Sequence, residues 1–204
     1  RAEPPSSPWW RLRAPGGEAD QGVQFSLPSL TREWTLGPHR AHLIVTLQAP
    51  EGAGATARER LSAFTSFLAA VTSVSPAVGV YWGGAGATHE PGFFVETARS
   101  QEVVGRLALW TGVSLASEPD GRGISLLSLG MKQLGLPELL LVVSPRRARE
   151  GLDLFLNLLD YAVSRGTPLP EGDTIGMSED ERVPIRYVPS PVDPAARVWR
   201  VEFE

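Results

Sequence analysis

Leu139-Leu-Leu-Val-Val-Ser-Pro145 joins five consecutive aliphatic residues to a helix start signal. A short, continuous apolar run is typical of a strand that is buried on both faces. Ser144 can accept a hydrogen bond from an amide of the first helical turn, and Pro145 suits the first helical position, where an N–H has no partner. The stretch therefore predicts a buried strand that leads directly into a helix.

Two long helices are expected from the spacing of apolar residues. After Pro145, the apolar positions fall on one face until Gly166, at Leu152, Phe155, Leu156, Leu159 and Val163. In the first half, Thr56 and Glu59 form a capping-box pattern, which satisfies otherwise unpaired amides of a first helical turn. Apolar residues follow it at Leu61, Phe64, Leu68 and Val71.

Further segments have the composition or the alternation of strands. They are Val23–Leu27, Ala41–Leu47, Ala77–Trp82, Leu107–Leu115, Ile124–Leu129, Arg182–Val188 and Arg197–Phe203. The prediction is an α+β fold in which a mixed β-sheet has the two main helices packed on it, as a ferredoxin-like or a pseudo-duplicated α/β sandwich. We expect a proline-rich irregular arm over residues 1–22 and a single α+β domain over 23–204, with halves at 23–104 and 105–204.

Composition restricts the function classes. The net charge is −4 and no basic tract is present, so nucleic acid is not an expected partner. Cysteine is absent, which excludes disulfides and thiolate chemistry and fits a cytoplasmic protein. No run reaches the roughly 18 apolar residues of a membrane span, so no membrane insertion is expected. The chain starts at Arg1 without a methionine, and we expect it to be a fragment or a trimmed product.

The stretch Val78-Gly-Val-Tyr-Trp-Gly-Gly-Ala-Gly86 is the best candidate for a binding loop. Glycines after a strand and before a helix can present free amides to a ligand. The spacing matches neither nucleotide-binding glycine motif and no lysine is available, so no cofactor is expected. The candidate binding residues are Trp82, Gly83, Gly84, Gly86 and Trp110, because tryptophan dominates binding surfaces. A strand-to-helix junction, with both tryptophans in the core, explains the same residues.

A catalytic alternative uses His89 and Glu90 for proton transfer, with Asp173 approaching from the second half. The competing interpretation is that Thr88 and His89 cap the helix that follows. No metal site is expected, since His39 and His42 precede a strand and their side chains would diverge, and since Glu179-Asp-Glu181 is typical of a solvated loop.

Six motifs occur in an order that resembles a known bacterial family. They are His42-Leu-Ile-Val-Thr46, Gly79-Val-Tyr-Trp-Gly83, Leu109-Trp-Thr-Gly112, Leu134-Gly-Leu-Pro-Glu-Leu139, Gly172-Asp-Thr-Ile-Gly176 and Ile185-Arg-Tyr-Val-Pro-Ser190. The chain resembles domain of unknown function 4261 from about Val23 to Phe203. The resemblance implies no catalytic residue.

We expect a non-enzymatic bacterial protein-interaction module with a protein partner, such as an immunity or adaptor protein associated with a secretion system. This expectation rests on the missing catalytic set, the tryptophans and the acidic balance, together with analogy. The alternatives are a small-molecule-binding or hydrolytic enzyme with a site at Gly83–Glu90, and a structural domain of a larger assembly.

Overall fold

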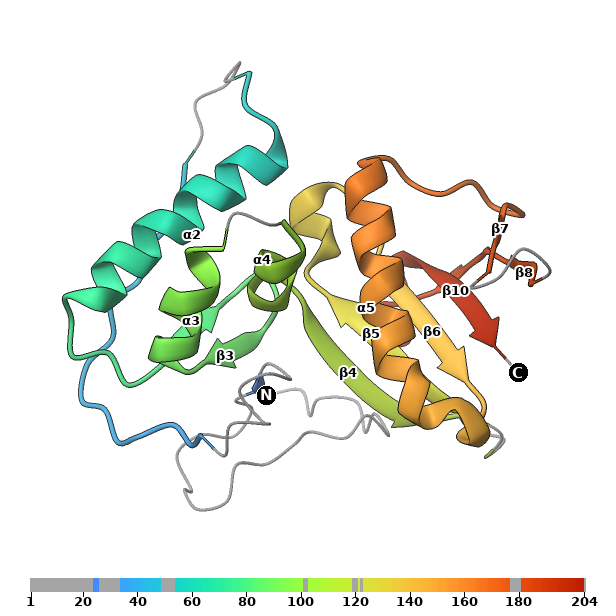
Figure 1. The fold of residues 1–204 in the computed structure, drawn as a ribbon, viewed down its shortest axis with the longest axis horizontal. Helices are drawn as coiled ribbons and strands as arrows, with labels where there is room; N and C mark the ends of the chain where they lie inside the picture. Colours follow the sequence, from blue (N-terminus) through green and yellow to red (C-terminus); the bar gives the residue numbers. More distant parts are fainter. Residues whose placement is uncertain are drawn as a thin grey trace. The chain divides into compact units, whose positions relative to one another are not determined.

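The computed structural model describes residues 24–25, 34–48, 54–100, 103–118, 121, 123–176 and 181–203. The arm expected over 1–22 lies outside these residues. Among the described residues the chain forms two compact units, of which the N-terminal unit ends at Gly112 and the C-terminal unit begins at Val113. Helices and a mixed sheet are both present, so the α+β class is confirmed (Figure 1).

The C-terminal unit is built on a five-stranded sheet with the order β4-β5-β6-β10-β9. These strands are β4 (Gly112–Ser117), β5 (Ile124–Leu129), β6 (Leu139–Val143), β9 (Arg186–Pro189) and β10 (Arg197–Phe203). Strand β6 is antiparallel to β5 and parallel to β10, and β10 is antiparallel to β9. Every residue of β6 is buried, as its continuous apolar run predicted.

Helix α5 (Ala148–Arg165) packs on strands β5 and β6 (Figure 1). Its Gly151 allows a close approach, because a Cβ atom there would lie 3.0 Å from a methyl group of Val143. A helical turn begins at the predicted Pro145, as the 3₁₀ helix η2 (Pro145–Arg147), but α5 itself begins at Ala148 with Arg147 as its N-cap residue, so the predicted N-cap at Ser144 is wrong for α5. Gly166 ends α5 in the left-handed conformation, with φ of 70°, as its position suggested.

Shorter elements complete the C-terminal unit. The 3₁₀ helix η1 (Met131–Leu134) connects β5 to β6, and β7 (Thr174–Ile175) pairs with β8 (Val183–Pro184) in a small antiparallel ladder.

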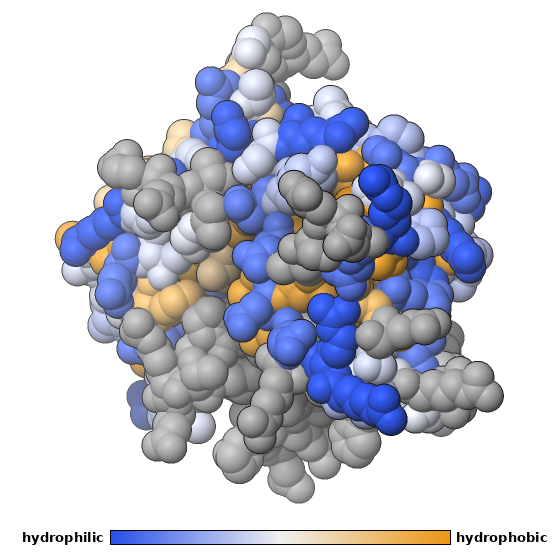
Figure 2. All heavy atoms as spheres, turned by 45° about the vertical axis from the view of Figure 1, so that its right-hand side comes forward, coloured by the Kyte–Doolittle hydropathy of each residue, from blue (hydrophilic) through white to orange (hydrophobic). Residues whose placement is uncertain are grey.

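On the face drawn in Figure 2, hydrophilic side chains are interspersed with smaller areas of apolar surface, as is usual for a solvated protein surface.

The described part of the N-terminal unit contains three short strands and three helices. Strand β3 (Ala87–His89) lies between β1 (Gln24–Phe25), to which it is parallel, and β2 (Val80–Trp82), to which it is antiparallel. The helices are α2 (Ala57–Ser73), α3 (Pro91–Ala98) and α4 (Val103–Trp110), and α3 packs against both of the others. The two main helices, α2 and α5, therefore belong to different units.

The capping box that begins α2 is confirmed. The Thr56 amide donates to Glu59 Oε2 at 2.7 Å, and the Glu59 amide donates to Thr56 Oγ1 at 3.2 Å. The Thr56 amide and the Thr56 hydroxyl group both donate to the Glu59 carboxylate, and these two hydrogen bonds lower its pKa because they favour its charged form. The local sequence signal was sufficient here since both partners lie within one helical turn.

Two strand predictions are wrong in the structure. Residues 41–47 belong to no helix or strand, and most of their side chains are exposed. The segment Leu107–Leu115 divides instead at Thr111, into the end of α4 and the start of β4. Short apolar runs fit either a helix or a strand, and a strand also needs a pairing partner that the run itself does not specify.

In the part of the chain that the structure describes, none of the helices has the length and the apolar character that a membrane span requires.

A buried polar contact joins α2 to α4. Thr65 and Trp110 both have 0% exposure. Thr65 Oγ1 donates to the Leu61 carbonyl oxygen at 2.7 Å and accepts a hydrogen bond from Trp110 Nε1 at 2.8 Å. One hydroxyl group thus satisfies an indole N–H that has been taken out of water.

We predict that Thr65→Val destabilises the protein by about 1–3 kcal/mol, because it removes a buried acceptor while the indole donor stays buried. Thr65→Ser is the matched control, since it keeps the hydroxyl group and loses only a methyl group. Urea denaturation followed by circular dichroism measures both variants. An equal loss of stability in the two variants would contradict the role given to the hydroxyl group.

Candidate functional site

The glycine stretch forms the turn of a β-hairpin. The Ala85 amide donates to the Trp82 carbonyl at 3.1 Å, and the Gly86 amide donates to the Gly83 carbonyl at 3.3 Å. Gly86 has φ of 62°, a conformation that favours glycine. The expected direct junction between a strand and a helix is wrong, because β3 separates this turn from α3.

The two candidate binding tryptophans lie in the core of the N-terminal unit. Trp82 is 3% exposed, and its ring centroid lies 5.6 Å from that of Phe64 and 6.2 Å from that of Phe94. Trp110 is fully buried and bonded to Thr65. At this hairpin the exposed residues are Gly83, Gly84 and the ring of Tyr81, which is 65% exposed.

His89 is buried completely, with 0% exposure. Its Nε2 lies 3.0 Å from the Leu109 carbonyl oxygen, and the rings of Phe93 and Phe94 are packed beside it. Burial lowers the pKa of His89 to about 4, since an imidazolium ion is poorly solvated there, although the hydrogen bond to Leu109 opposes this shift. The ring is therefore neutral at pH 7, and Nε2 carries the proton that it donates to Leu109.

Glu90 and Asp173 occupy different units. Glu90 is the N-cap residue of α3, but its side chain makes no capping hydrogen bond; the expected capping by Thr88 or His89 is also wrong, because both residues lie in β3. Asp173 is exposed in the C-terminal unit, where its Oδ1 accepts from the Thr174 amide at 3.0 Å. A hydrogen bond from the next backbone amide to an aspartate side chain is typical of a turn, so this contact suits a turn residue.

The described residues contain no group of three or more histidine or acidic side chains that could hold a metal ion. His39 and His42 are both exposed. Glu181 accepts a hydrogen bond from Arg147 Nη1 at 3.1 Å, whereas residues 179 and 180 lie outside the described part of the chain.

Sequence reasoning missed a carboxylate that is held by four donors. Glu138 Oε1 accepts from the Gly130 amide at 2.8 Å and the Lys132 amide at 3.4 Å. Its Oε2 accepts from Ser128 Oγ at 2.5 Å and the Met131 amide at 3.2 Å. Glu138 thus supplies a negative charge to the first turn of η1, where amides have no helical acceptor.

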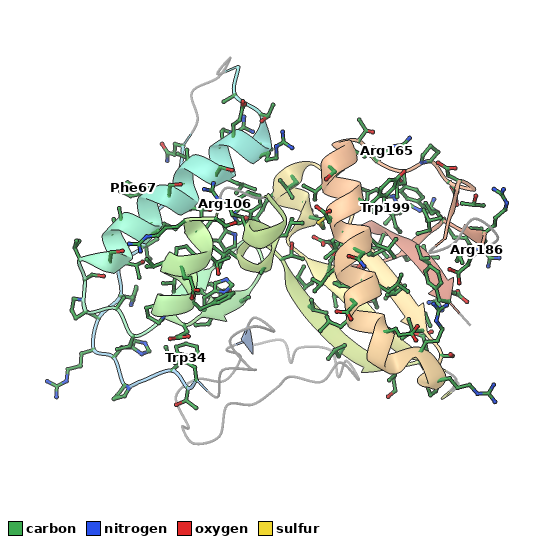
Figure 3. The ribbon with its side chains drawn as sticks, in the orientation of Figure 1. Trp34, Phe67, Arg106, Arg165, Arg186 and Trp199 are labelled. Atoms are coloured by element: carbon green, nitrogen blue, oxygen red, sulfur yellow. The ribbon has the colours of Figure 1, made fainter. Side chains whose placement is uncertain are left out.

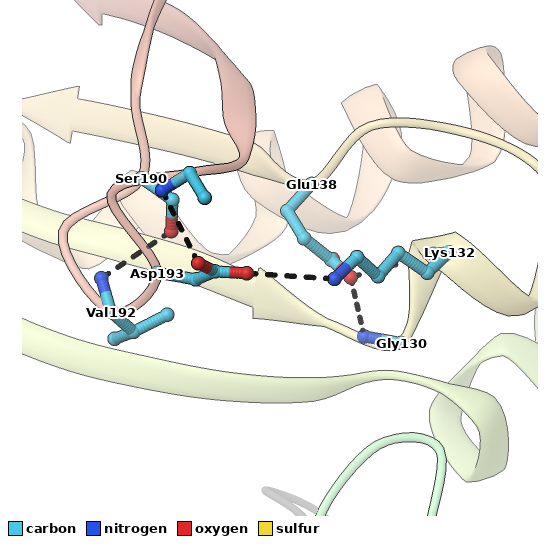
Figure 4. A network of polar contacts seen from close by, with 7 residues as sticks. Gly130, Lys132, Glu138, Ser190, Val192 and Asp193 are labelled. Carbon is cyan, nitrogen blue, oxygen red and sulfur yellow. Dashed lines mark hydrogen bonds and ion pairs between the residues drawn. The ribbon is translucent and has the colours of Figure 1, made fainter.

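The loop between β9 and β10 lies beside this carboxylate network. Lys132 Nζ is 3.8 Å from Asp193 Oδ2, and the Val192 amide donates to Ser190 Oγ at 3.3 Å (Figure 4). Both charged side chains are more than half exposed, so this ion pair contributes little to stability. The hydrogen bonds to Glu138 therefore stabilise the fold, whereas the exposed ion pair between Lys132 and Asp193 adds little to it.

A second charged cluster surrounds Arg200 on β10. Its Nη2 lies 2.9 Å from Glu118 Oε2, and its Nε lies 2.5 Å from Glu202 Oε1. Ser125 Oγ donates to the other oxygen of Glu118. Burial alone would lower the pKa of Arg200, but hydrogen bonds to Glu202 and Glu118 raise it above its usual value. The Arg200 guanidinium group therefore forms ion pairs within the unit, and the pair with Glu118 connects segments that are distant in the sequence.

We predict that Glu138→Gln destabilises the protein by about 1–3 kcal/mol, because an amide NH₂ cannot accept the hydrogen bonds that both carboxylate oxygens receive. Glu171→Gln is the control, since that carboxylate is exposed and its ion pair with Arg197 spans 3.8 Å. The control should change the free energy of unfolding by less than about 0.5 kcal/mol. Equal effects in urea denaturation would show that the network does not stabilise the fold.

His89 gives a pH dependence of stability. Between pH 6.5 and about 4 the unfolded chain binds a proton on this residue and the folded chain does not, so stability falls as pH falls through this range. The full loss is about 3 kcal/mol below pH 4.

His89→Gln should remove this part of the pH dependence, because glutamine does not titrate. His42→Gln, at an exposed position, should leave it unchanged. Denaturation curves between pH 4 and 8 measure the slopes. Identical slopes for His89→Gln and the unsubstituted protein would contradict the assignment.

Comparison with known protein families found a match within the C-terminal unit. A family model described as Domain of unknown function (DUF4261) matches residues 127–202, from β5 to β10. The motifs expected at 134–139, 172–176 and 185–190 lie inside this match, and those at 42–46, 79–83 and 109–112 lie outside it. No curated protein and no solved structure matches the chain. The family resemblance is therefore shown for residues 127–202, where the chain matches a domain of unknown function, DUF4261.

Proposed function

We propose that the chain is a non-catalytic protein-interaction module that holds one protein partner in the bacterial cytoplasm, as an adaptor or immunity protein does. The observation that carries the proposal is the exposure of an aliphatic run at residues 41–47. Leu43 is 73% exposed, Ile44 76% and Leu47 50%. This segment lies outside any helix or strand, between β1 and α2 (Figure 1).

The composition of the run suits a binding segment. Single exposed leucines are common on protein surfaces, but three large aliphatic side chains within five residues are unusual. Burial of each on binding contributes about 1.5–3 kcal/mol at most. Because Ile44, Val45 and Thr46 are β-branched, the run also suits addition of a strand to a partner sheet.

The proposal moves the recognition surface away from the tryptophans. Trp82 and Trp110 are buried and stabilise the N-terminal unit from within, so their side chains are not presented to a partner. The exposed Tyr81 ring and the hairpin glycines remain available at the surface. The catalytic alternative at Gly83–Glu90 receives less support, because His89 has no exposed surface through which to meet a substrate.

We predict that affinity purification from the native host retrieves one stoichiometric partner, and that the double variant Leu43→Asp/Ile44→Asp loses it. A charge in the centre of an apolar contact weakens binding by about 2 kcal/mol or more, which is more than tenfold. Ser75→Asp/Thr167→Asp is the control, because it introduces the same two negative charges at exposed polar positions outside residues 41–47. Thermal denaturation should give similar midpoints for all variants, since the replaced side chains are exposed.

Several results would overturn this proposal. They are the absence of a stoichiometric partner, equal retention by the double variant and the control, and turnover of a small molecule by the purified chain. Coexpression of the captured partner separates the two roles: growth inhibition that the chain relieves identifies an immunity protein. Absence of inhibition argues against the immunity role and leaves the adaptor role.

A further inference from the structure

A hollow of ≈490 Å³ lies within the N-terminal unit, between α2 and the end of α3. Its volume falls in the range of small-molecule sites. Two buried alanines, Ala69 of α2 and Ala98 of α3, line it and leave the space open because their side chains end at Cβ. No candidate residue from the sequence lies in this hollow.

Two guanidinium groups line the hollow. Arg106 of α4 is half-buried, and its Nε donates to the Ser100 carbonyl oxygen at 2.9 Å, which fixes the position of the group (Figure 3). Arg99 follows the last turn of α3, is exposed and makes no ion pair with any described residue. A guanidinium carries five N–H donors, so most of the donors here remain for a ligand.

Two serine hydroxyl groups complete the lining. Ser66 Oγ donates to the Ser62 carbonyl at 2.9 Å, and Ser73 Oγ donates to the Ala69 carbonyl at 2.7 Å. Their protons are directed to the backbone of α2, so their oxygens can accept from a ligand. The lining therefore offers strong donors at Arg99 and Arg106 and acceptors on α2.

The adjoining hollow of ≈560 Å³ sets the orientation of a ligand. It shares Ser73 and Arg99 with the first and is lined also by Val95 and Glu96. A negative group would be repelled at Glu96 and attracted towards Arg106. The less polar part of a ligand would lie along Val95.

We infer that these hollows bind a small molecule that carries an oxyanion, either a carboxylate or a phosphate. Arg99 and Arg106 bind the oxyanion, because planar guanidinium groups match its geometry and its charge. Hydroxyl or amine groups of the ligand donate to Ser66 and Ser73. This site goes beyond the proposed protein-binding function, and it uses none of the residues 41–47.

Titration with pyrophosphate and with citrate tests the inference, at constant ionic strength and with glycerol as the neutral probe. Nuclear magnetic resonance of ¹⁵N-labelled protein follows the Nε–H signal of Arg106 and the amides of residues 98–106. We expect at least one of the two anions to give saturable shifts, with a smaller effect in added salt. Saturation by pyrophosphate identifies a phosphate site, and saturation by citrate identifies a carboxylate site.

Arg99→Gln should weaken binding about tenfold, because it removes one charge-assisted contact from an exposed side chain without disturbing the fold. Arg106→Gln should weaken it at least as much. Arg58→Gln is the matched control, since Arg58 is an exposed arginine of α2 outside the hollow. Shifts that fail to saturate with both anions, or equal binding by Arg99→Gln and Arg58→Gln, would overturn the site.

Discussion

The parallel pairing of β6 with β10 is the constraint on which the C-terminal unit depends. Five residues of β6 pair with five residues of β10, from Leu139 with Trp199 to Val143 with Phe203. Strand β5 pairs with the other edge of β6. The backbone groups of β6 therefore have hydrogen-bond partners on both sides, although all side chains of β6 are buried. Because β6 and β10 run in the same direction, the chain must cross back over the sheet between them. Helix α5 belongs to that connection and covers β5 and β6.

The polar clusters of this unit hold the same pairing in place. The Trp199 amide donates to the Glu138 carbonyl at 2.9 Å, and the Ser144 amide donates to the Phe203 carbonyl at 3.1 Å, which extends the ladder at both ends. The Glu138 carboxylate fixes the turn that enters β6, and Arg200 connects β10 to Glu118. These groups are costly to bury unless they are paired, and here each of them has defined partners. Their chemistry is used to stabilise the unit that contains the DUF4261 match.

The N-terminal unit uses its chemically attractive residues in a similar way. His89, Trp110 and Thr65 are buried; His89 bonds to the Leu109 carbonyl oxygen, and Trp110 donates to Thr65. Among the described residues of this unit, the surface includes an aliphatic run at 41–47 and a hollow lined by arginine and serine. Both features lie outside residues 127–202. They are therefore proposed as properties of this chain, not of the matched domain.

The sequence alone determined the elements whose signals are local. The capping box of α2, the apolar run of β6 and the glycine end of α5 each depend on residues within a few positions of one another. Only the tertiary structure decided the contacts between distant segments. His89 looks like an acid-base residue in the sequence, but Leu109, twenty positions away, and two phenylalanines bury it and lower its pKa. Residues 41–47 have strand composition, yet they are exposed because composition does not supply a pairing partner. Burial and strand pairing depend on the whole fold, and for that reason the sequence pattern could not provide them.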